Sequence, residues 1–189
     1  MTLLFDASGQ RKYLTPTQRR EFLRVAQDAA GPVSTFCATL GLTGCRISEA
    51  LGLTGSRVDL AAGILLFESL KKRRRGIYRG VPVPPAFLET LASVHGLPSL
   101  HDARLWEWSR TTAWRRVKEV LDAAEIRGLC ASPKGVRHAF GIKAVTSEVP
   151  LPMIQKWLGH SRLATTAIYT NAIGPEEQEI ARRMWDAYL

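Results

Sequence analysis

Apolar residues recur at helical spacing along most of the chain, and glycine, proline or short polar turns interrupt them. The pair Thr15-Pro16 is typical of an N-cap followed by a proline at the first helical position, and predicts a helix that runs to about residue 30. Gly31-Pro32 breaks the pattern. A second apolar helix is predicted over 36–42 and a third over 46–51.

The pattern changes in the middle of the chain. Residues 64–67 and 78–83 are short apolar runs bounded by glycine, prolines and a block of cations, which predicts two strands of one hairpin. Helical spacing then returns over 87–91, 109–124, 134–145, 151–158, 164–169 and 175–188. The predicted fold class is mainly α with a small antiparallel β-sheet (α+β).

Composition narrows the class of partner. The chain has 189 residues, of which 26 are Lys or Arg and 17 are Asp or Glu, so the formal net charge is +9. The length fits one domain with at most a short arm, and the hydrophobic content of 46% is that of a globular protein. A cationic excess of this size favours a polyanion such as nucleic acid, although a merely soluble basic protein would look the same.

The cysteines and the N-terminal sequence indicate the cellular compartment. Cys37, Cys45 and Cys130 are odd in number and follow no metal-binding spacing, which predicts buried free thiols in a reducing compartment. The first residues do not resemble a signal peptide, and the longest uncharged stretch, within 28–46, is too short and too polar to span a bilayer. A cytoplasmic protein is expected.

Four polar segments are candidates for chemistry. Arg46 follows a tight turn with Glu49 three residues later, so the carboxylate can hold the guanidinium and aim it outward. Lys71 lies on the hairpin, where it could deliver a proton or contact a phosphate. Each feature alone is more typical of a surface ion pair or a solvated lysine.

The other two segments lie near the C-terminus. Lys134 and Arg137 share one helical face near the predicted start of a helix, with His138 beside them, which is a favourable place for a phosphate. His160 follows Leu-Gly, and Tyr169 comes nine residues later on a neighbouring predicted helix. Taken singly, such a histidine and such a tyrosine are more often core residues.

Together, in this order and spacing, the segments resemble the tyrosine recombinase (phage integrase) family over roughly residues 15–175. The resemblance implies the catalytic-domain fold and a site-specific DNA recombinase or integrase. Such an enzyme cleaves and rejoins DNA through a 3′-phosphotyrosyl intermediate, needs no metal, ATP or other cofactor, and acts on double-stranded DNA.

The resemblance also implies a role for each residue. Arg46 and Arg137 would grip the scissile phosphate, His160 would donate a hydrogen bond to it, and Tyr169 would attack it. Lys71 would protonate the departing 5′ oxygen, with the adjacent Lys72 as the alternative.

Other residues would support this set. Lys134 stands where many members of the family have histidine, so the base for the tyrosine is left open. Glu49 and His138 would lie behind the catalytic residues and orient them without contacting the phosphate. Five cations of the hairpin would contact the flanking DNA backbone: Lys72, Arg73, Arg74, Arg75 and Arg79.

The resemblance also suggests a domain organisation. Residues 1–14 are expected to form an arm, 15–174 the catalytic domain, and 175–189 a helix that packs in cis or on a neighbouring protomer. No separate DNA-binding domain is expected before the catalytic one, whether the chain is a minimal protein or a fragment, so DNA binding is expected to be weak and strongly salt-dependent. A monomer in isolation and a tetramer on DNA are expected.

Two alternatives to the recombinase function stay open. One is a catalytically silent DNA-binding regulator with a helix-turn-helix within 143–169, and the other is type IB topoisomerase-like activity.

Overall fold

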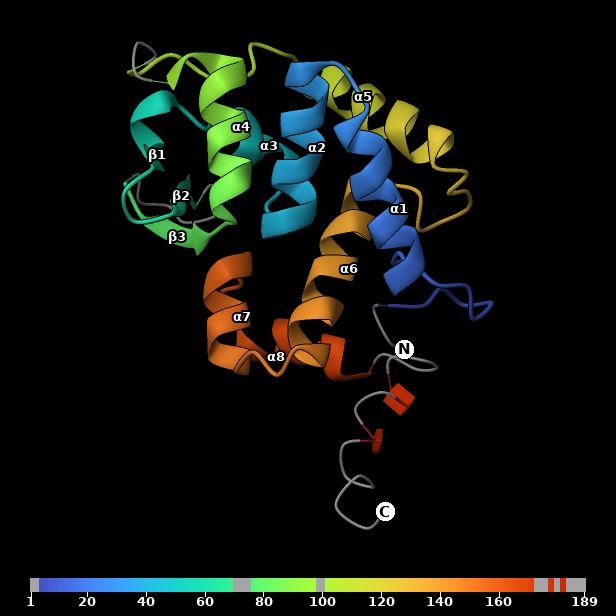
Figure 1. The fold of residues 1–189 in the computed structure, drawn as a ribbon. Helices are drawn as coiled ribbons and strands as arrows, with labels where there is room; N and C mark the ends of the chain where they lie inside the picture. The colour runs from blue at the N-terminus through green and yellow to red at the C-terminus, as the bar shows by residue number, and fades with distance from the viewer. Residues whose placement is uncertain (1–3, 70–75, 98–100, 172–176, 179–180, 183–189) are drawn as a thin grey trace.

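A computed structural model of the chain describes residues 4–69, 76–97, 101–171, 177–178 and 181–182. In Figure 1, helices surround a central helix, and a small sheet lies at one edge of the molecule. The predicted class, mainly α with a small antiparallel sheet, is confirmed. No helix among the described residues is long and apolar enough to cross a membrane.

Local signals in the sequence explain where the first helices begin and end. α1 (Pro16–Gln27) starts with a capping box, in which the Thr15 side chain accepts from the N–H of Gln18 and the Gln18 side chain accepts from the N–H of Thr15. α2 (Gly31–Thr43) begins at the Gly-Pro pair, which therefore starts this helix as well as ending the previous pattern. Its C-cap, Gly44, has a φ of 62°, a left-handed conformation that glycine adopts without strain.

The remaining described elements follow the predicted order closely. They are α3 (Ile47–Leu51), the 3-10 turn η1 (Gly55–Arg57), β1 (Val58–Asp59), β2 (Ile64–Glu68), β3 (Tyr78–Pro82), α4 (Pro85–His95), α5 (Arg110–Ala123), α6 (Pro133–Thr146), α7 (Leu151–Leu158), α8 (Leu163–Ala167) and the 3-10 turn η3 (Ile168–Asn171). Most of the helix predicted over 175–188 lies outside the described residues.

The sheet is antiparallel in the order β1-β2-β3. Leu65 and Phe67 of β2 are buried while their neighbours are only partly so, which is the alternation expected of a half-covered strand. Leu65 pairs with Val81 of β3, which is also buried. The two-residue strand β1 was not predicted, because its length leaves no readable pattern.

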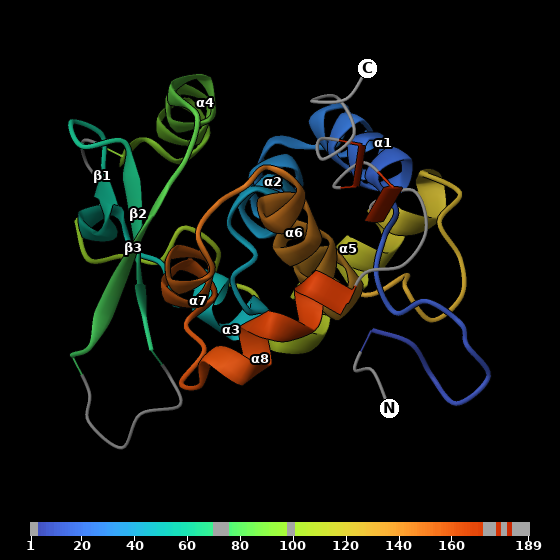
Figure 2. The same ribbon diagram turned by 90° about the horizontal axis from the view of Figure 1, so that it is seen from below.

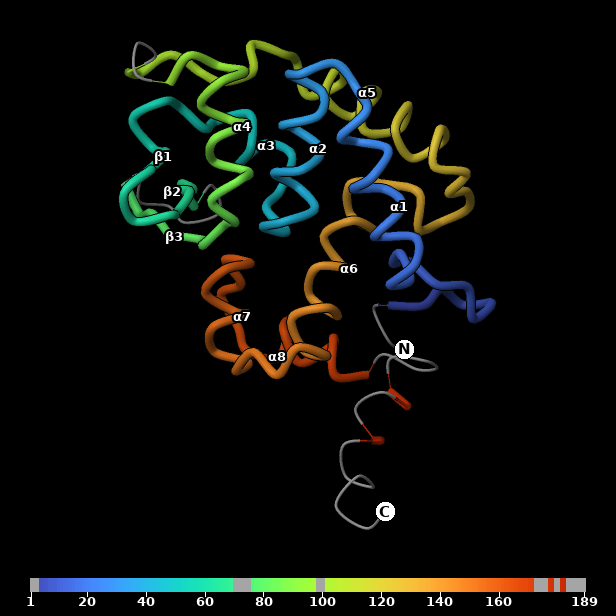
Figure 3. Tube along the Cα trace, viewed as in Figure 1, coloured from blue at the N-terminus to red at the C-terminus, as the bar shows by residue number. Residues whose placement is uncertain are grey.

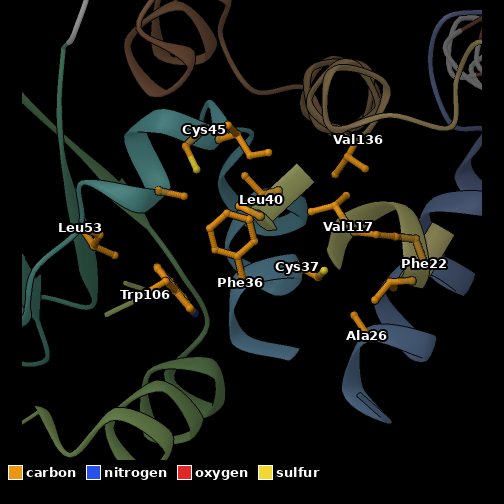
Figure 4. Packing of buried hydrophobic residues seen from close by; sticks show 14 of the residues in the cluster. Phe22, Ala26, Phe36, Cys37, Leu40, Cys45, Leu53, Trp106, Val117 and Val136 are labelled. Atoms are coloured by element: carbon orange, nitrogen blue, oxygen red, sulfur yellow. The ribbon is translucent and has the colours of Figure 1, made fainter. Parts of the chain in front are cut away.

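The main core forms around α2, which packs against α1, α4, α5 and α6. Figure 4 shows Phe36 at its centre with Leu40 and Trp106 beside it. The Phe36 ring meets those of Trp106 and Trp108 edge-on, with centroids 5.1 and 5.4 Å apart. All three cysteines are free thiols and buried, as the sequence predicted.

A second, smaller apolar cluster lies below the main core. Its buried members are Leu4, Tyr13, Phe140, Ile142, Ala144, Ile154, Leu158 and Tyr169. The first described residues contribute to it, since Leu4 and Tyr13 are fully buried against the body of the domain. The trace in Figure 3 shows α6, α7 and α8 following one another through this layer, and Figure 2 shows α7 between β3 and α6. The candidate site forms where this layer meets α3.

Candidate active site

Arg46 is placed by the turn that ends α2. It is the N-cap residue of α3, and its backbone N–H donates to Glu49 Oε2 at 2.7 Å. Its guanidinium Nη1 donates to Glu49 Oε1 at 2.6 Å. The Arg46 side chain keeps 30% of its surface exposed, so it is anchored on one side and open on the other.

Glu49 lies beneath three arginines. Its side chain is fully buried, and Oε2 accepts from Arg79 Nη2 at 2.7 Å and lies 4.0 Å from Arg137 Nη1. Burial alone would raise the pKa of this carboxyl, but Arg79 and Arg46 outweigh it and hold the pKa below its usual value. Glu49 is therefore a carboxylate that organises the guanidinium groups around it.

Arg137, on α6, is held between the C-terminal ends of two other helices. Nη1 donates to the carbonyl of Gly44 after α2 at 2.6 Å, and Nη2 donates to the carbonyl of Leu158 in α7 at 2.7 Å. Helix C-terminal carbonyls carry unpaired acceptors and partial negative charge, so they favour a cation here. Burial and the neighbouring Arg46 lower the pKa of Arg137 to about 10, which leaves it protonated at neutral pH.

Tyr169 is almost completely buried, with 1% of its surface exposed. Its Oη lies 3.2 Å from Nδ1 of His138. Its ring lies directly over Gly141 of α6, where a Cβ atom would come within 2.5 Å of Cζ. Burial raises the pKa of the Tyr169 phenol and lowers that of His138 to about 4. At neutral pH the pair therefore consists of a phenol and a neutral imidazole.

His160 completes the cluster. It follows Gly159, whose left-handed conformation (φ 66°) ends α7, and its Nδ1 lies 3.0 Å from Oγ1 of Thr166. Its ring is nearly parallel to that of Tyr169, with centroids 6.2 Å apart. Burial and the nearby Arg137 lower the pKa of His160 to about 4, so it is also neutral at pH 7.

Two clefts open onto these groups. One, of about 520 Å³, is lined by Arg46, Lys134, Arg137, His138, His160 and Tyr169 among others. The other, of about 670 Å³, lies between the hairpin and α7 and shares Arg46 and His160 with the first. Arginine side chains line both clefts, and the first cleft also reaches Tyr169.

The structure thus brings together seven residues singled out in the sequence: Arg46, Glu49, Lys134, Arg137, His138, His160 and Tyr169. The hairpin cations Lys71, Lys72, Arg73, Arg74 and Arg75 lie outside the described residues.

Arg79 differs from its expected position on the DNA-facing surface. Its side chain is 5% exposed, pairs with Glu49 and donates through Nε to the carbonyl of Trp157 at 2.7 Å. These contacts give Arg79 an internal role, because Nε, Nη1 and Nη2 each donate to an acceptor within the protein. Sequence analysis missed this role, since Glu49 is thirty residues away along the chain.

Thr166 was also missed. It is fully buried and contacts His160, but a threonine three residues before a tyrosine carries no signal of its own.

A family model and several curated proteins match this chain in sequence. The model of the phage integrase family matches residues 12–173. The tyrosine recombinase XerD of Haemophilus influenzae is 40% identical over 68 residues, which is 36% of this chain and 23% of that protein. XerD of Pseudomonas aeruginosa is 36% identical over 86 residues, 46% of this chain and 28% of that protein. The match therefore spans less than a third of either curated relative.

Solved structures share the fold. The XerA recombinase matches with a TM-score of 0.76 and 23% identity, over 93% of this chain and 64% of that one. The catalytic domain of bacteriophage HP1 integrase matches with a TM-score of 0.66 and 21% identity, over 92% of this chain and 95% of that one. With the family model covering most of its length, the chain belongs to the phage integrase family.

Proposed function

We propose that this chain is the catalytic domain of a site-specific DNA recombinase that breaks and rejoins DNA through a 3′-phosphotyrosyl intermediate. One observation carries the proposal: two arginines, a histidine and a tyrosine, distant in sequence, line one cationic cleft. A regulator that only binds DNA has no need for a buried tyrosine hydroxyl beside such a cluster.

The phosphate would bind between Arg46 and Arg137. Guanidinium groups pair with phosphoryl oxygens through two parallel hydrogen bonds and stabilise charge that develops in the transition state. Glu49 pairs directly with Arg46 and with Arg79 and lies 4.0 Å from Arg137, so a single negative charge is shared among three cations. The cluster therefore keeps a net positive charge for the phosphate in the cleft.

Tyr169 would attack phosphorus. The bond between its Oη and phosphorus forms as the bond from phosphorus to the 5′ oxygen breaks, which leaves a covalent protein–DNA link and a 5′-hydroxyl. Because the link conserves the phosphodiester bond, the reverse step rejoins DNA without ATP. Lys71 would supply the proton to the departing oxygen.

His138 would receive the proton of Tyr169, since its Nδ1 lies 3.2 Å from the hydroxyl. The raised pKa of the phenol makes this transfer unfavourable at rest, so it would accompany the attack on phosphorus. Lys134, a cation on the cleft wall, would then donate to the phosphate rather than serve as base.

The partner would be double-stranded DNA, and we propose that the protein acts on it in the cytoplasm of a bacterial host. Recombination exchanges strands between two duplexes, so we propose a monomer in isolation and four copies assembled on two duplexes. Light scattering on the free protein and on its DNA complex would measure both masses. A complex that never exceeds one copy per duplex would contradict the tetramer.

A suicide substrate tests the central proposal. Nicked duplexes tiled across the DNA that flanks the gene should trap a covalent adduct with the wild-type protein, visible as a shift on a denaturing gel. Tyr169→Phe should abolish the adduct while DNA binding stays within about twofold. Tyr13→Phe, in the same apolar cluster, is the matched control and should keep it. An adduct that persists in Tyr169→Phe would place the nucleophile elsewhere.

A further inference from the structure

The family resemblance implies that His160 donates a hydrogen bond to the phosphate, and this bond depends on which ring nitrogen carries the hydrogen. His160 is neutral at pH 7, so only one ring nitrogen bears a proton. Nδ1 faces Thr166, which leaves the Nε2 edge for a ligand in the cleft. A hydrogen on Nε2 can donate to a phosphoryl oxygen, whereas a bare lone pair there would repel it.

Thr166 decides between the two tautomers. Its side chain is fully buried, and among the described residues its hydroxyl has no hydrogen-bond partner other than Nδ1 of His160, at 3.0 Å. If Nδ1 carried the hydrogen, the Thr166 hydroxyl would accept it, and its own hydrogen would be buried without an acceptor. If the hydroxyl donates to Nδ1, the buried hydroxyl hydrogen has its acceptor, and the ring hydrogen lies on Nε2 at the edge left for the cleft. Buried donors are rarely left unpaired, so the second arrangement is favoured.

We infer that Thr166 is a positioning residue for the recombination site: its hydroxyl donates to Nδ1 of His160 and so fixes the ring hydrogen on Nε2, facing the scissile phosphate. The inference rests on the proposed function for its consequence, but not for the tautomer itself.

Other contacts hold the backbone of His160 and cover its ring. The His160 N–H donates to the carbonyl of Gln155, and the Gln155 side chain donates to the carbonyl of His160 at 3.1 Å. The ring also lies nearly parallel to that of Tyr169. The contribution specific to Thr166 is therefore the choice of tautomer, and a variant that lacks the hydroxyl should keep the ring in place.

Two substitutions separate this role from a structural one. Thr166→Val removes the hydroxyl and keeps the shape, whereas Thr166→Ser keeps the hydroxyl. Thr39→Val is the control for loss of a buried threonine hydroxyl, because Thr39 is fully buried in α2 away from the clefts. Nitrogen-15 NMR of the free protein at pH 7 reports the tautomer of His160, and single-turnover cleavage of the nicked duplex reports its consequence.

The wild type and Thr166→Ser should show hydrogen on Nε2. Thr166→Val should show a mixture of tautomers and cleave about 10- to 100-fold more slowly, since it loses part of an electrostatic contact made in the transition state. A wild-type hydrogen on Nδ1, or an unchanged tautomer in Thr166→Val, would overturn the inference. If the tautomers are as expected but no protein cleaves any duplex, the proposed function fails and the assignment to Thr166 stands.

Discussion

At the hydroxyl of Tyr169, hydrogen bonding is left incomplete. If the phenol donates to Nδ1 of His138, the ring hydrogen lies on Nε2, a buried atom with no hydrogen-bond partner among the described residues. If Nδ1 donates instead, the hydrogen of the phenol lacks a partner. Native proteins seldom leave such groups unpaired unless the site uses them. The first arrangement is the one that leads to proton transfer from Tyr169 to His138.

His138→Ala tests that transfer. The variant should cleave the nicked duplex about 100-fold more slowly, and added imidazole should restore part of the rate, because a diffusible base can replace the missing ring. His101→Ala, an exposed residue outside both clefts, should be neither slowed nor rescued. A slow variant that imidazole does not rescue would make His138 structural.

The dependence of kcat/KM on pH is a second test of proton transfer from Tyr169 to His138. The neutral form of His138 accepts the proton, and its pKa is lowered from 6.5 to about 4. The wild-type kcat/KM should therefore stay level as pH falls from 7 to about 5 and decline as pH passes through about 4.

Residue spacing predicted some of these contacts and could not predict others. Glu49 lies three residues after Arg46 on a helix start, and the expected ion pair is present at 2.6 Å. The contact of Arg79 with Glu49 depends on how the hairpin packs against α3, and the contact of Thr166 with His160 depends on the turn after α7. Neither arrangement leaves a local trace in the sequence.

At the scale of elements, Arg79 joins three parts of the fold. It projects from β3, pairs with Glu49 of α3 and donates to the carbonyl of Trp157 in α7. Gly159 leaves room for it, since a Cβ atom there would lie 3.0 Å from the guanidinium carbon. A buried ion pair thus links the hairpin to the catalytic cluster.

Removing Arg79 should therefore cost more than a surface ion pair. Arg79→Met removes one of the two direct ion-pair partners of the buried Glu49 carboxylate and leaves Arg46 as the other, and urea denaturation should show a loss of about 1–3 kcal/mol in the free energy of unfolding. Glu49→Gln combined with Arg79→Met should recover part of that loss. The matched control is Arg116→Met, which breaks an exposed pair with Glu119 and should cost about 1 kcal/mol or less. Equal losses for Arg79 and Arg116 would contradict the linking role.

Element boundaries were predictable wherever the chain marks them with a cap. Thr15, Ser109 and Ser132 each accept a hydrogen bond from the first turn of the following helix, and all three helices begin within one residue of the predicted position. Strand β1 has no such mark, because two residues form it only through pairing with β2.

At the scale of the whole molecule, the +9 charge should dominate binding to DNA. If about five phosphates are neutralised, the logarithm of the association constant should fall with the logarithm of salt with a slope of about −4.5, which is about 500-fold between 50 and 200 mM. Fluorescence anisotropy on a short duplex would measure this slope.

Lys134→Gln should make the slope shallower by about one. Arg24→Gln, which carries its charge on α1 in pairs with Glu21 and Asp28, should leave the slope unchanged. A slope near zero would exclude phosphate neutralisation as the source of affinity.

The seat of Tyr169 over Gly141 makes the proposed nucleophile a structural member of the lower apolar cluster. If the hydroxyl moves toward phosphorus, the Tyr169 ring loses part of its packing contacts in this cluster. Loss of all of these contacts would cost about 2–4 kcal/mol. Contacts with DNA must offset that work, so the free protein keeps its reactive group sheltered from stray phosphodiesters. Tighter packing of the lower apolar cluster should therefore stabilise the fold and slow the attack of Tyr169 on phosphorus, because the same side chain serves both.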